Sequence, residues 1–148
     1  MRSLSLLLLL ASMAWAPAGG GQIFATIEEC DAALGKPVAP TGQVPDVRFY
    51  KHDDLTIKVL FVEAKAAVIT YTSLTSLKIP EDKQKKLLNA SAAGKTWEEV
   101  EGEGAKTWQR SDGQAFAIYD PASGELNIFS TDYIENAREE VQTAINQH

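Results

Sequence analysis

The clearest pattern of apolar and polar positions lies between residues 47 and 73. Every second position of its central run is apolar: Leu55, Ile57, Val59 and Phe61. A strand with this alternation buries one face completely. The runs Val47–Lys51 and Ala67–Ser73 on either side are rich in aromatic and β-branched residues, and Asp53-Asp54 and Glu63-Ala64-Lys65 separate the runs. We therefore predict a three-stranded antiparallel meander.

A second meander is predicted near the end of the chain. Its three runs are Lys106–Ser111, Gln114–Asp120 and Glu125–Ser130. Asp112-Gly113 is a strong hairpin signal between the first two runs, and Pro121-Ala122-Ser123-Gly124 joins the last two. Trp97 and Val100 precede this meander, and we assign them to an irregular loop that continues to Gly104. The two meanders together predict about six strands.

A first helix is expected in front of the first meander. Thr26 and Glu29 have the spacing of a capping box, in which each side chain accepts a hydrogen bond from the backbone of the other residue. Gly35 favours a left-handed cap after Leu34, and Pro37 prevents the helix from continuing. These signals predict a helix of about two turns that ends at Leu34.

Two further helices are expected, one between the meanders and one after them. The second runs from Pro80 to about Ala93, because proline fits the first helical position and Gly94 ends the run. The third covers residues 132–146, where one stripe is apolar: Ile134, Ala137, Val141 and Ile145. A stripe with this spacing is typical of a helix that packs on a core. We therefore expect residues 132–146 to close the fold.

These elements predict an α+β domain with one antiparallel sheet in the order α-βββ-α-βββ-α. Within the segments 26–74 and 80–131, helix stops, strands and turns coincide without a gap at one constant offset, which places Phe49 on Trp108 and Ile69 on Ile128. We hypothesise two tandem helix-plus-meander units, with Phe49 and Trp108 in equivalent core positions. The alternative is that two similar supersecondary units arose independently.

Residues 1–18 differ from the rest of the chain. Arg2 gives a positive start, an apolar run follows from Leu4 to Trp15, and Ala16-Pro17-Ala18 is a small-x-small cleavage signal. This is the pattern of a secretory signal peptide, and the run is shorter than the roughly 20 residues of a membrane span. We therefore expect an exported protein, periplasmic or extracellular, without a membrane span. A flexible lead-in is expected at residues 19–25, and a single domain at 26–148.

The balance of charge narrows the classes of partner. The chain has 20 acidic and 14 basic residues, a net charge of −6 that becomes −7 when Arg2 leaves with the signal peptide. An acidic protein of this kind does not bind nucleic acid through the phosphates, so we expect no nucleic-acid partner. Cys30 is the only cysteine, which excludes an internal disulfide, and it is remote from the cleavage site, so no lipid anchor is expected. We expect Cys30 to be buried beside Leu34.

Few residues suggest catalysis or ligand binding. His52 stands in a turn with Asp53 and Asp54, and three or four ligands at zinc spacing are not present, so no metal and no cofactor are predicted. Serines lack the glycine-flanked elbow of a nucleophile. Aromatic residues are the remaining candidates for binding. Strand alternation favours Tyr50 and Tyr119 at the surface, and Trp97 lies in an acidic loop.

The entry into the first meander resembles a known group of envelope domains. Thr26, Leu34, Gly35 and Pro37 match the "Thr…Leu-Gly-x-Pro" entry of domains grouped with the β-lactamase-inhibitor protein and the SmpA/OmlA outer-membrane lipoproteins. The similarity continues as a pattern to about Ser73. This chain has one helix where those domains usually have a pair, and it lacks their lipid-bearing cysteine. The resemblance implies a binding or assembly module of a bacterial envelope.

Three functional hypotheses follow. The first is a secreted, non-enzymatic binding module of the bacterial cell envelope, which contacts a protein or an envelope component through one sheet face or the loop from Trp97 to Gly104. The second is a secreted protein that binds a small ligand in a closed apolar pocket between the sheet and a helix. The third is a small hydrolase, in which His52 lies about 3 Å from a nucleophile.

Overall fold

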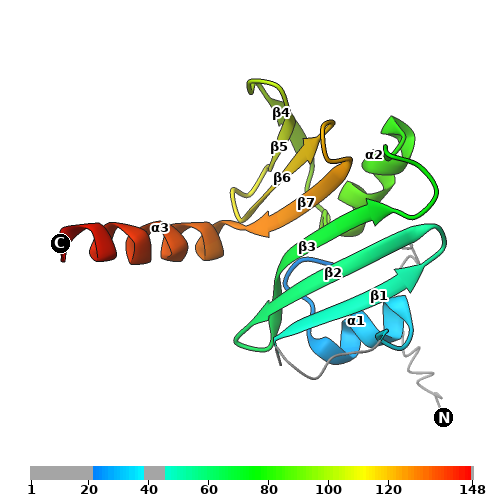
Figure 1. Ribbon diagram of the computed structural model, residues 1–148, viewed down its shortest axis with the longest axis horizontal. Coiled ribbons are helices and arrows are strands. Elements are labelled where there is room, and N and C mark those ends of the chain that lie inside the picture. Colours follow the sequence, from blue (N-terminus) through cyan, green and yellow to red (C-terminus); the bar gives the residue numbers. More distant parts are fainter. Residues whose placement is uncertain (1–21, 39–45, 148) are drawn as a thin grey trace, which may run out of the picture.

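A computed structural model describes residues 22–38 and 46–147 of the chain (Figure 1). It is an α+β fold with one antiparallel sheet of seven strands. The elements in chain order are α1 (Ile27–Leu34), β1 (Val47–His52), β2 (Leu55–Val62), β3 (Lys65–Ser73), α2 (Glu81–Ala90), β4 (Trp97–Val100), β5 (Lys106–Arg110), β6 (Ala115–Asp120), β7 (Glu125–Ser130) and α3 (Thr131–Asn146). The predicted signal peptide and residues 39–45 of the predicted loop lie outside the described residues.

The sheet joins two meanders through their last strands. Its spatial order is β1-β2-β3-β7-β6-β5-β4, and every neighbouring pair is antiparallel. At the junction of β3 and β7, Ile69 lies opposite Ile128, the same pair that the alignment of the two segments superimposes. The two meanders are therefore arranged about an approximate two-fold axis near this pair. The hypothesis of two related units remains a prediction.

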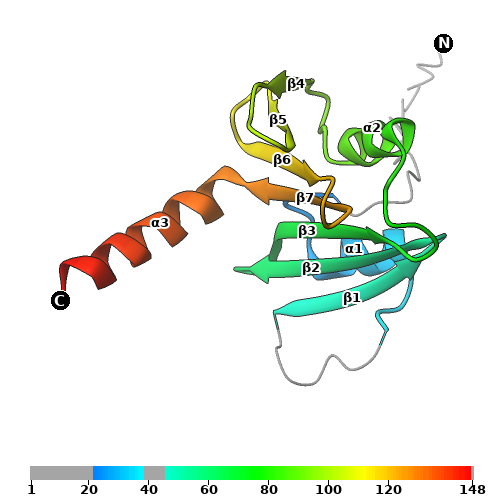
Figure 2. The same cartoon turned by 45° about the horizontal axis from the view of Figure 1, so that its top comes forward.

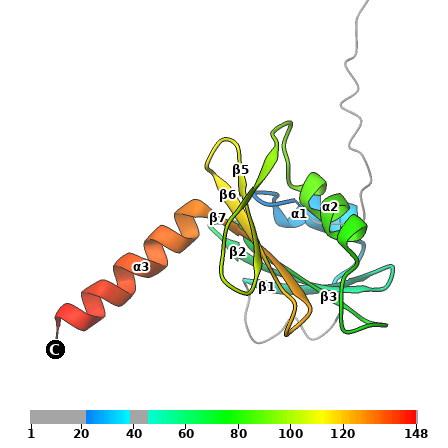
Figure 3. The same ribbon diagram turned by 90° about the horizontal axis from the view of Figure 1, so that it is seen from above.

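Both α1 and α2 cover the same face of the sheet (Figures 1 and 3). The capping box of α1 forms as predicted: Thr26 Oγ1 accepts from the Glu29 amide at 3.2 Å. Between the two helices and the sheet lies the core, whose fully buried large side chains come mainly from the strands: Tyr50, Leu55, Ile57, Val59, Ile69, Tyr71, Ile79, Leu126 and Ile128. The alternating residues of β2 are buried on this face, as the sequence predicts.

The segment expected to be a flexible lead-in is part of the core where the structure describes it. Ile23 and Ala25 are buried, and the Phe24 amide donates to the Ala66 carbonyl at 2.8 Å. The Ile23 amide donates to Ser91 Oγ, which follows α2. The prediction of a flexible 19–25 is therefore wrong for residues 22–25. The physical reason is that Ile23 and Ala25 pack in the core and the backbone of this segment hydrogen-bonds with Ala66.

Two other expectations need correction. The irregular loop predicted after Trp97 begins as a strand, β4, which makes the sheet seven strands wide rather than six. Phe49 and Trp108 do not occupy equivalent core positions. Trp108 is buried on the helix-covered face, whereas Phe49 is 38% exposed on the other face, beside Lys58 of β2. A constant offset therefore does not preserve the direction of the side chains in β1 and β5.

The third helix forms as predicted but does not close the fold. α3 follows β7 without a loop and extends away from the body (Figures 1 and 2). None of its residues is buried, and Val141 and Ile145 are 60% and 62% exposed. The outer half of the apolar stripe of α3 is thus uncovered, while Ile134 and Ala137 near β7 are partly buried. Among the described residues, no helix has the length and apolar character needed to cross a membrane.

Candidate functional site

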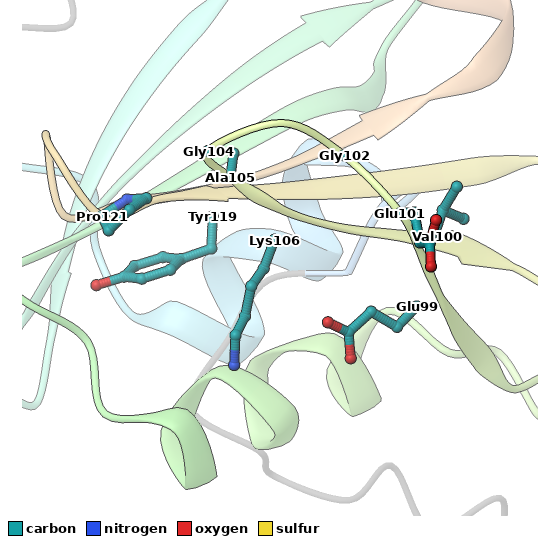
Figure 4. Close-up of a pocket in the computed structure, with 9 residues that line it drawn as sticks. All are labelled: Glu99, Val100, Glu101, Gly102, Gly104, Ala105, Lys106, Tyr119 and Pro121. Carbon is teal, nitrogen blue, oxygen red and sulfur yellow. The ribbon is translucent and has the colours of Figure 1, made fainter.

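A large hollow on the described surface lies beside the β4–β5 hairpin (Figure 4). We call it the β4 groove. It has a volume of about 810 Å³ and is open to solvent. The lining residues come from β4, the following loop, β5 and the end of β6: Glu99, Val100, Glu101, Gly102, Gly104, Ala105, Lys106, Tyr119 and Pro121. The groove therefore includes part of the acidic loop and one of the three aromatic residues singled out from the sequence.

Register in the sheet explains why these side chains meet. Lys106 of β5 lies directly opposite Tyr119 of β6, and both point to the helix-covered face. Glu99 of β4 points to this face as well, because it pairs with buried Trp108. Figure 4 shows Glu99 and Lys106 extending side by side toward α2. The groove is thus bounded by the β4–β5 hairpin and by the end of β6.

Polar contacts fix two of the walls. Lys106 Nζ lies 3.5 Å from Glu81 Oε1 at the start of α2. The Tyr119 hydroxyl accepts a hydrogen bond from the Ile79 amide at 3.2 Å, a contact that is buried. Tyr119 is only 6% exposed, so its assignment to the surface is wrong, although one side of its ring borders the groove. The groove is consequently mixed in character. Charged side chains and a hydrogen-bonded tyrosine line it together with apolar ones: Glu99, Glu101, Lys106, Tyr119, Val100, Ala105 and Pro121.

β4 forms one edge of the sheet, and its last two residues, Glu99 and Val100, line the groove. It pairs only with β5 among the described strands. An edge strand presents backbone N–H and C=O groups that point away from its single partner. The opposite edge, β1, is partly capped, because the Val38 amide donates to the Phe49 carbonyl at 2.7 Å. The side chains of Glu98, Glu99 and Val100 are exposed along β4.

Trp97 begins β4 and joins it to α2. Its indole nitrogen donates to the Leu88 carbonyl at 2.7 Å, and its ring is half-buried against the core. Both contacts hold the Trp97 ring against the end of α2 and the core. The candidate binding role of Trp97 remains a prediction, and substitution of this residue changes the support of β4 as well as any surface it presents.

Tyr50 lies far from the β4 groove and has a structural position. It is fully buried, so the expectation of a surface tyrosine is wrong. Its hydroxyl donates to Asp31 Oδ1 at 2.6 Å, and Arg48 donates to the other oxygen of that carboxylate at 3.2 Å. Burial raises the pKa of Tyr50, and the hydrogen bond to Asp31 adds to the shift. This group of three holds α1 on β1.

The histidine of the hydrolase hypothesis stands in a turn. His52 Nε2 lies 3.7 Å from Asp53 Oδ2, and Asp53 is largely exposed. Asp54, the other acid of this turn, pairs instead with Lys83 of α2, which lowers the pKa of Asp54. Within residues 22–38 and 46–147, no three histidines, cysteines or carboxylates gather into a metal-binding cluster. Of the two acids that follow His52, Asp53 therefore lies near the histidine, whereas Asp54 pairs with Lys83.

Cys30 is buried beneath α1 as predicted, with 1% of its surface exposed. Burial raises the pKa of its thiol to about 12, and the neighbouring carboxylates of Asp31 and Glu29 add to the shift. Because the thiolate is the reactive form, the folded protein should react with a disulfide reagent at neutral pH about a thousandfold more slowly than an ordinary cysteine. Stopped-flow thiol titration measures this rate.

An exposed cysteine is the matched control, because it shows whether the slow reaction of Cys30 is due to its burial. Glu139→Cys in a Cys30→Ser background places the only thiol on exposed α3, and it should react at an ordinary rate. Denaturing urea should bring Cys30 to the same rate. A fast native reaction of Cys30 would contradict the inert, structural role.

The sequence pointed to part of the β4 groove and missed the rest. Glu98, Glu99, Glu101 and Glu103 form an acidic run in the sequence, but such runs are common on solvated surfaces, so the run alone does not indicate a groove. Lys106 was assigned only to a strand. The available signal was the hairpin turn at Asp112-Gly113, which sets β5 against β6 and brings Lys106 opposite Tyr119.

Comparison with known proteins gives no relatives: no family model matches the chain, and neither the curated proteins nor the solved structures contain a significant match.

Proposed function

We propose that this protein is an exported, non-enzymatic binding module of a bacterial envelope, and that it binds an extended, basic segment of a partner protein along β4. The observation that carries the proposal is the edge position of β4 next to the β4 groove. An extended segment adds to an exposed edge through backbone hydrogen bonds, while pockets beside the edge select its side chains. The envelope location rests on the signal-peptide pattern and on the resemblance to the SmpA/OmlA group.

The charge of the edge supports a basic partner. Glu98, Glu99, Glu101 and Glu103 are all exposed along β4 and the loop that follows it. Lys106 is the one lysine of the groove lining, and it lies near Glu81 of α2. A lysine or arginine entering the groove beside an added strand therefore meets carboxylates. Electrostatic complementarity of this kind favours association and selects against acidic segments.

A small-ligand function is the second candidate. The volume of the β4 groove falls within the range of roughly 300–1,000 Å³ typical of small-molecule sites. Such sites are enclosed and mostly apolar, whereas this groove is open and its longest side chains are charged or held by a hydrogen bond. The lining therefore supports the peptide segment better than an apolar ligand.

The proposal is tested with a synthetic peptide in which lysine and valine alternate. Binding is followed by anisotropy of a dye on the peptide and by the fluorescence of Trp97 and Trp108, which both lie in the β4–β5 hairpin. We expect salt-sensitive binding that is lost when backbone amides on one side of the peptide are methylated, because those amides form the ladder with β4. Glu99→Gln with Glu101→Gln should weaken binding about tenfold.

Two controls make the result specific. A peptide of alternating glutamate and valine should not bind. Glu135→Gln with Glu139→Gln removes the same number of carboxylates from α3 and should leave the affinity unchanged. Equal binding of the acidic and basic peptides, or binding that tolerates methylation on either side, would contradict strand addition at β4.

A further inference from the structure

The outer half of the apolar stripe of α3 has no partner among the described residues: Val141 and Ile145 are exposed, whereas Ile134 and Ala137, nearer β7, are partly buried. Ile134, Ala137, Val141 and Ile145 recur at helical spacing along a helix of 16 residues, and no residue of this helix is buried. A helix of this length extends about 24 Å. An isolated helix so short is marginally stable in water, and most helices in proteins owe their stability to the packing of an apolar face. We therefore expect α3 to be stabilised by a surface that covers its apolar stripe.

The junction with β7 prevents α3 from covering its own sheet. Ser130 ends β7, and its Oγ accepts from the Tyr133 amide at 3.2 Å as the N-cap of α3. Thr131 is tied to the β5–β6 turn twice, through its amide to the Gln114 carbonyl and through its hydroxyl to the Gly113 carbonyl. These bonds fix the first turn of α3 as a continuation of β7. Folding back would require this turn to unwind.

The face of the sheet opposite α1 and α2 is also uncovered. α3 leaves the body from the side of this face (Figure 3). We call it the open face. On strands β1–β3 and β6–β7 it presents apolar side chains that are half-buried or exposed: Phe49, Leu60, Val62, Val68, Phe116, Ile118 and Phe129. Phe116 and Phe129 stack at 5.1 Å between ring centroids. A sheet that is apolar on both faces normally packs on both.

Charge distinguishes the two halves of the open face. Lys51 and Lys58 lie on the half formed by β1 and β2, and both are exposed. Asp120 and Glu125 lie on the half formed by β6 and β7. α3 has four acidic residues and one basic residue, Arg138. The acidic helix is therefore complementary to the half with the lysines and is repelled by the other.

We propose that two copies of this chain associate by reciprocal docking, in which α3 of each copy lies with its apolar stripe across the β1–β3 part of the open face of the other. The exchange covers Val141 and Ile145 of the helix against Phe49 and Val62 of the sheet, which are four large apolar side chains left exposed in the single chain. A two-fold arrangement forms both contacts at once and leaves neither surface free for further growth.

A direct pairing of the two α3 helices is less favourable. In an antiparallel pair the stripe is centred between Ala137 and Val141, so the flanking Arg138 lies near Arg138 of the other copy and Glu140 near Glu140. Like charges that face one another across a helix pair are destabilising. The small side chain of Ala137 near the centre also makes this interface thinner than one with a sheet bearing Phe49 and Leu60.

The experiment measures the mass of the protein without residues 1–18 by sedimentation velocity over the micromolar to millimolar range. A helix variant combines Val141→Asp and Ile145→Asp. A face variant combines Phe49→Asp and Lys58→Glu. Each should raise the dissociation constant of the dimer by about a hundredfold, as expected when apolar anchors at the centre of an interface are lost. Gln142→Ala, beside the stripe, is the control that should leave it unchanged.

Mixing the two variants separates the possible arrangements. The face variant keeps an intact α3, and the helix variant keeps an intact open face, so reciprocal docking predicts a heterodimer through the one remaining contact. Pairing of α3 with α3 predicts instead that the face variant forms a homodimer and that the helix variant forms neither a homodimer nor a heterodimer. That result, or a wild-type protein that is monomeric at every concentration, would overturn the proposal. Near-ultraviolet circular dichroism of the dilute variants confirms that each is folded.

Discussion

Replacement of Gly124 by alanine is expected to lower the free energy of unfolding by about 3 kcal/mol, because two separate costs add at this position. Gly124 has φ +71, a left-handed conformation that costs a residue with a Cβ about 1 kcal/mol. A Cβ built there would also lie 2.0 Å from the Leu77 carbonyl oxygen. Backbone atoms cannot rotate away, and overpacking of this kind costs about 1–3 kcal/mol. Urea unfolding measures the loss.

Gly113 provides the matched control for this substitution. It occupies the β5–β6 turn with the same φ of +71, but a Cβ added there meets nothing within 4 Å. Gly113→Ala should therefore cost only the backbone term, about 1 kcal/mol. The difference between the two variants isolates the contact of the β6–β7 turn with Leu77. Equal losses in the two variants would show that this close approach relaxes freely.

Substitution of Arg110 by methionine should lower the free energy of unfolding by about 2–3 kcal/mol. Arg110 is 4% exposed and joins three parts of the fold. Nε and Nη2 donate to the two oxygens of Asp112 at 2.9 Å, Nη1 donates to the Ser91 carbonyl at 2.9 Å, and the guanidinium lies 5.5 Å from the centre of the Phe24 ring. Hydrogen bonds from a charged donor each contribute about 1.5–3 kcal/mol when buried. Methionine keeps much of the aliphatic stem.

Arg48→Met is the control for Arg110. Arg48 is partly exposed on the edge strand β1 and donates to Asp31, so its loss should cost less than about 1 kcal/mol. Thermal unfolding of the wild-type protein, Arg110→Met and Arg48→Met under the same conditions compares their losses of stability. A loss at Arg110 no larger than that at Arg48 would contradict the role of Arg110 in joining α2, the β5–β6 turn and the segment at Phe24.

The dependence of stability on pH gives a second test of Arg110. Its hydrogen bonds hold the pKa of Asp112 below the ordinary value. A carboxyl whose pKa is lower in the folded state stabilises the fold above its unfolded pKa of about 4, and this contribution is lost as the pH falls below that value. Arg110→Met should therefore reduce the loss of stability in acid. The Asp54 pair with Lys83 remains and keeps part of that loss.

Local signals predicted most of the elements because each depended on neighbours in the chain. The capping box at Thr26, the alternation in β2 and the turn at Asp53-Asp54 all act within a few residues. β4 was missed for the same reason. Trp97 and Val100 point to opposite faces of the sheet, with an acidic residue beside each, so the strand has no apolar side to recognise.

Which face of the sheet a side chain points to could be predicted only from the pairing of its strand with a neighbouring strand. Val47–Lys51 offers two possible faces, one with Phe49 and one with Tyr50. The two-residue turn after His52 sets Tyr50 opposite Ile57, and Ile57 lies on the buried face of β2. That pairing was available from the sequence, whereas the position of α3 was not. Periodicity identifies its apolar stripe but does not say which surface the stripe contacts.

The glutamates of β4 have a consequence for the solubility of the protein. An exposed edge strand can join the edge of another molecule, and continued pairing of this kind leads to aggregates. In an antiparallel contact between two β4 strands, Glu98 and Glu99 of one molecule would face the same acidic stretch of the other. Their repulsion opposes growth through this edge while a basic segment can still approach. The same few side chains thus oppose pairing between two β4 edges and leave β4 accessible to the basic segment that we propose.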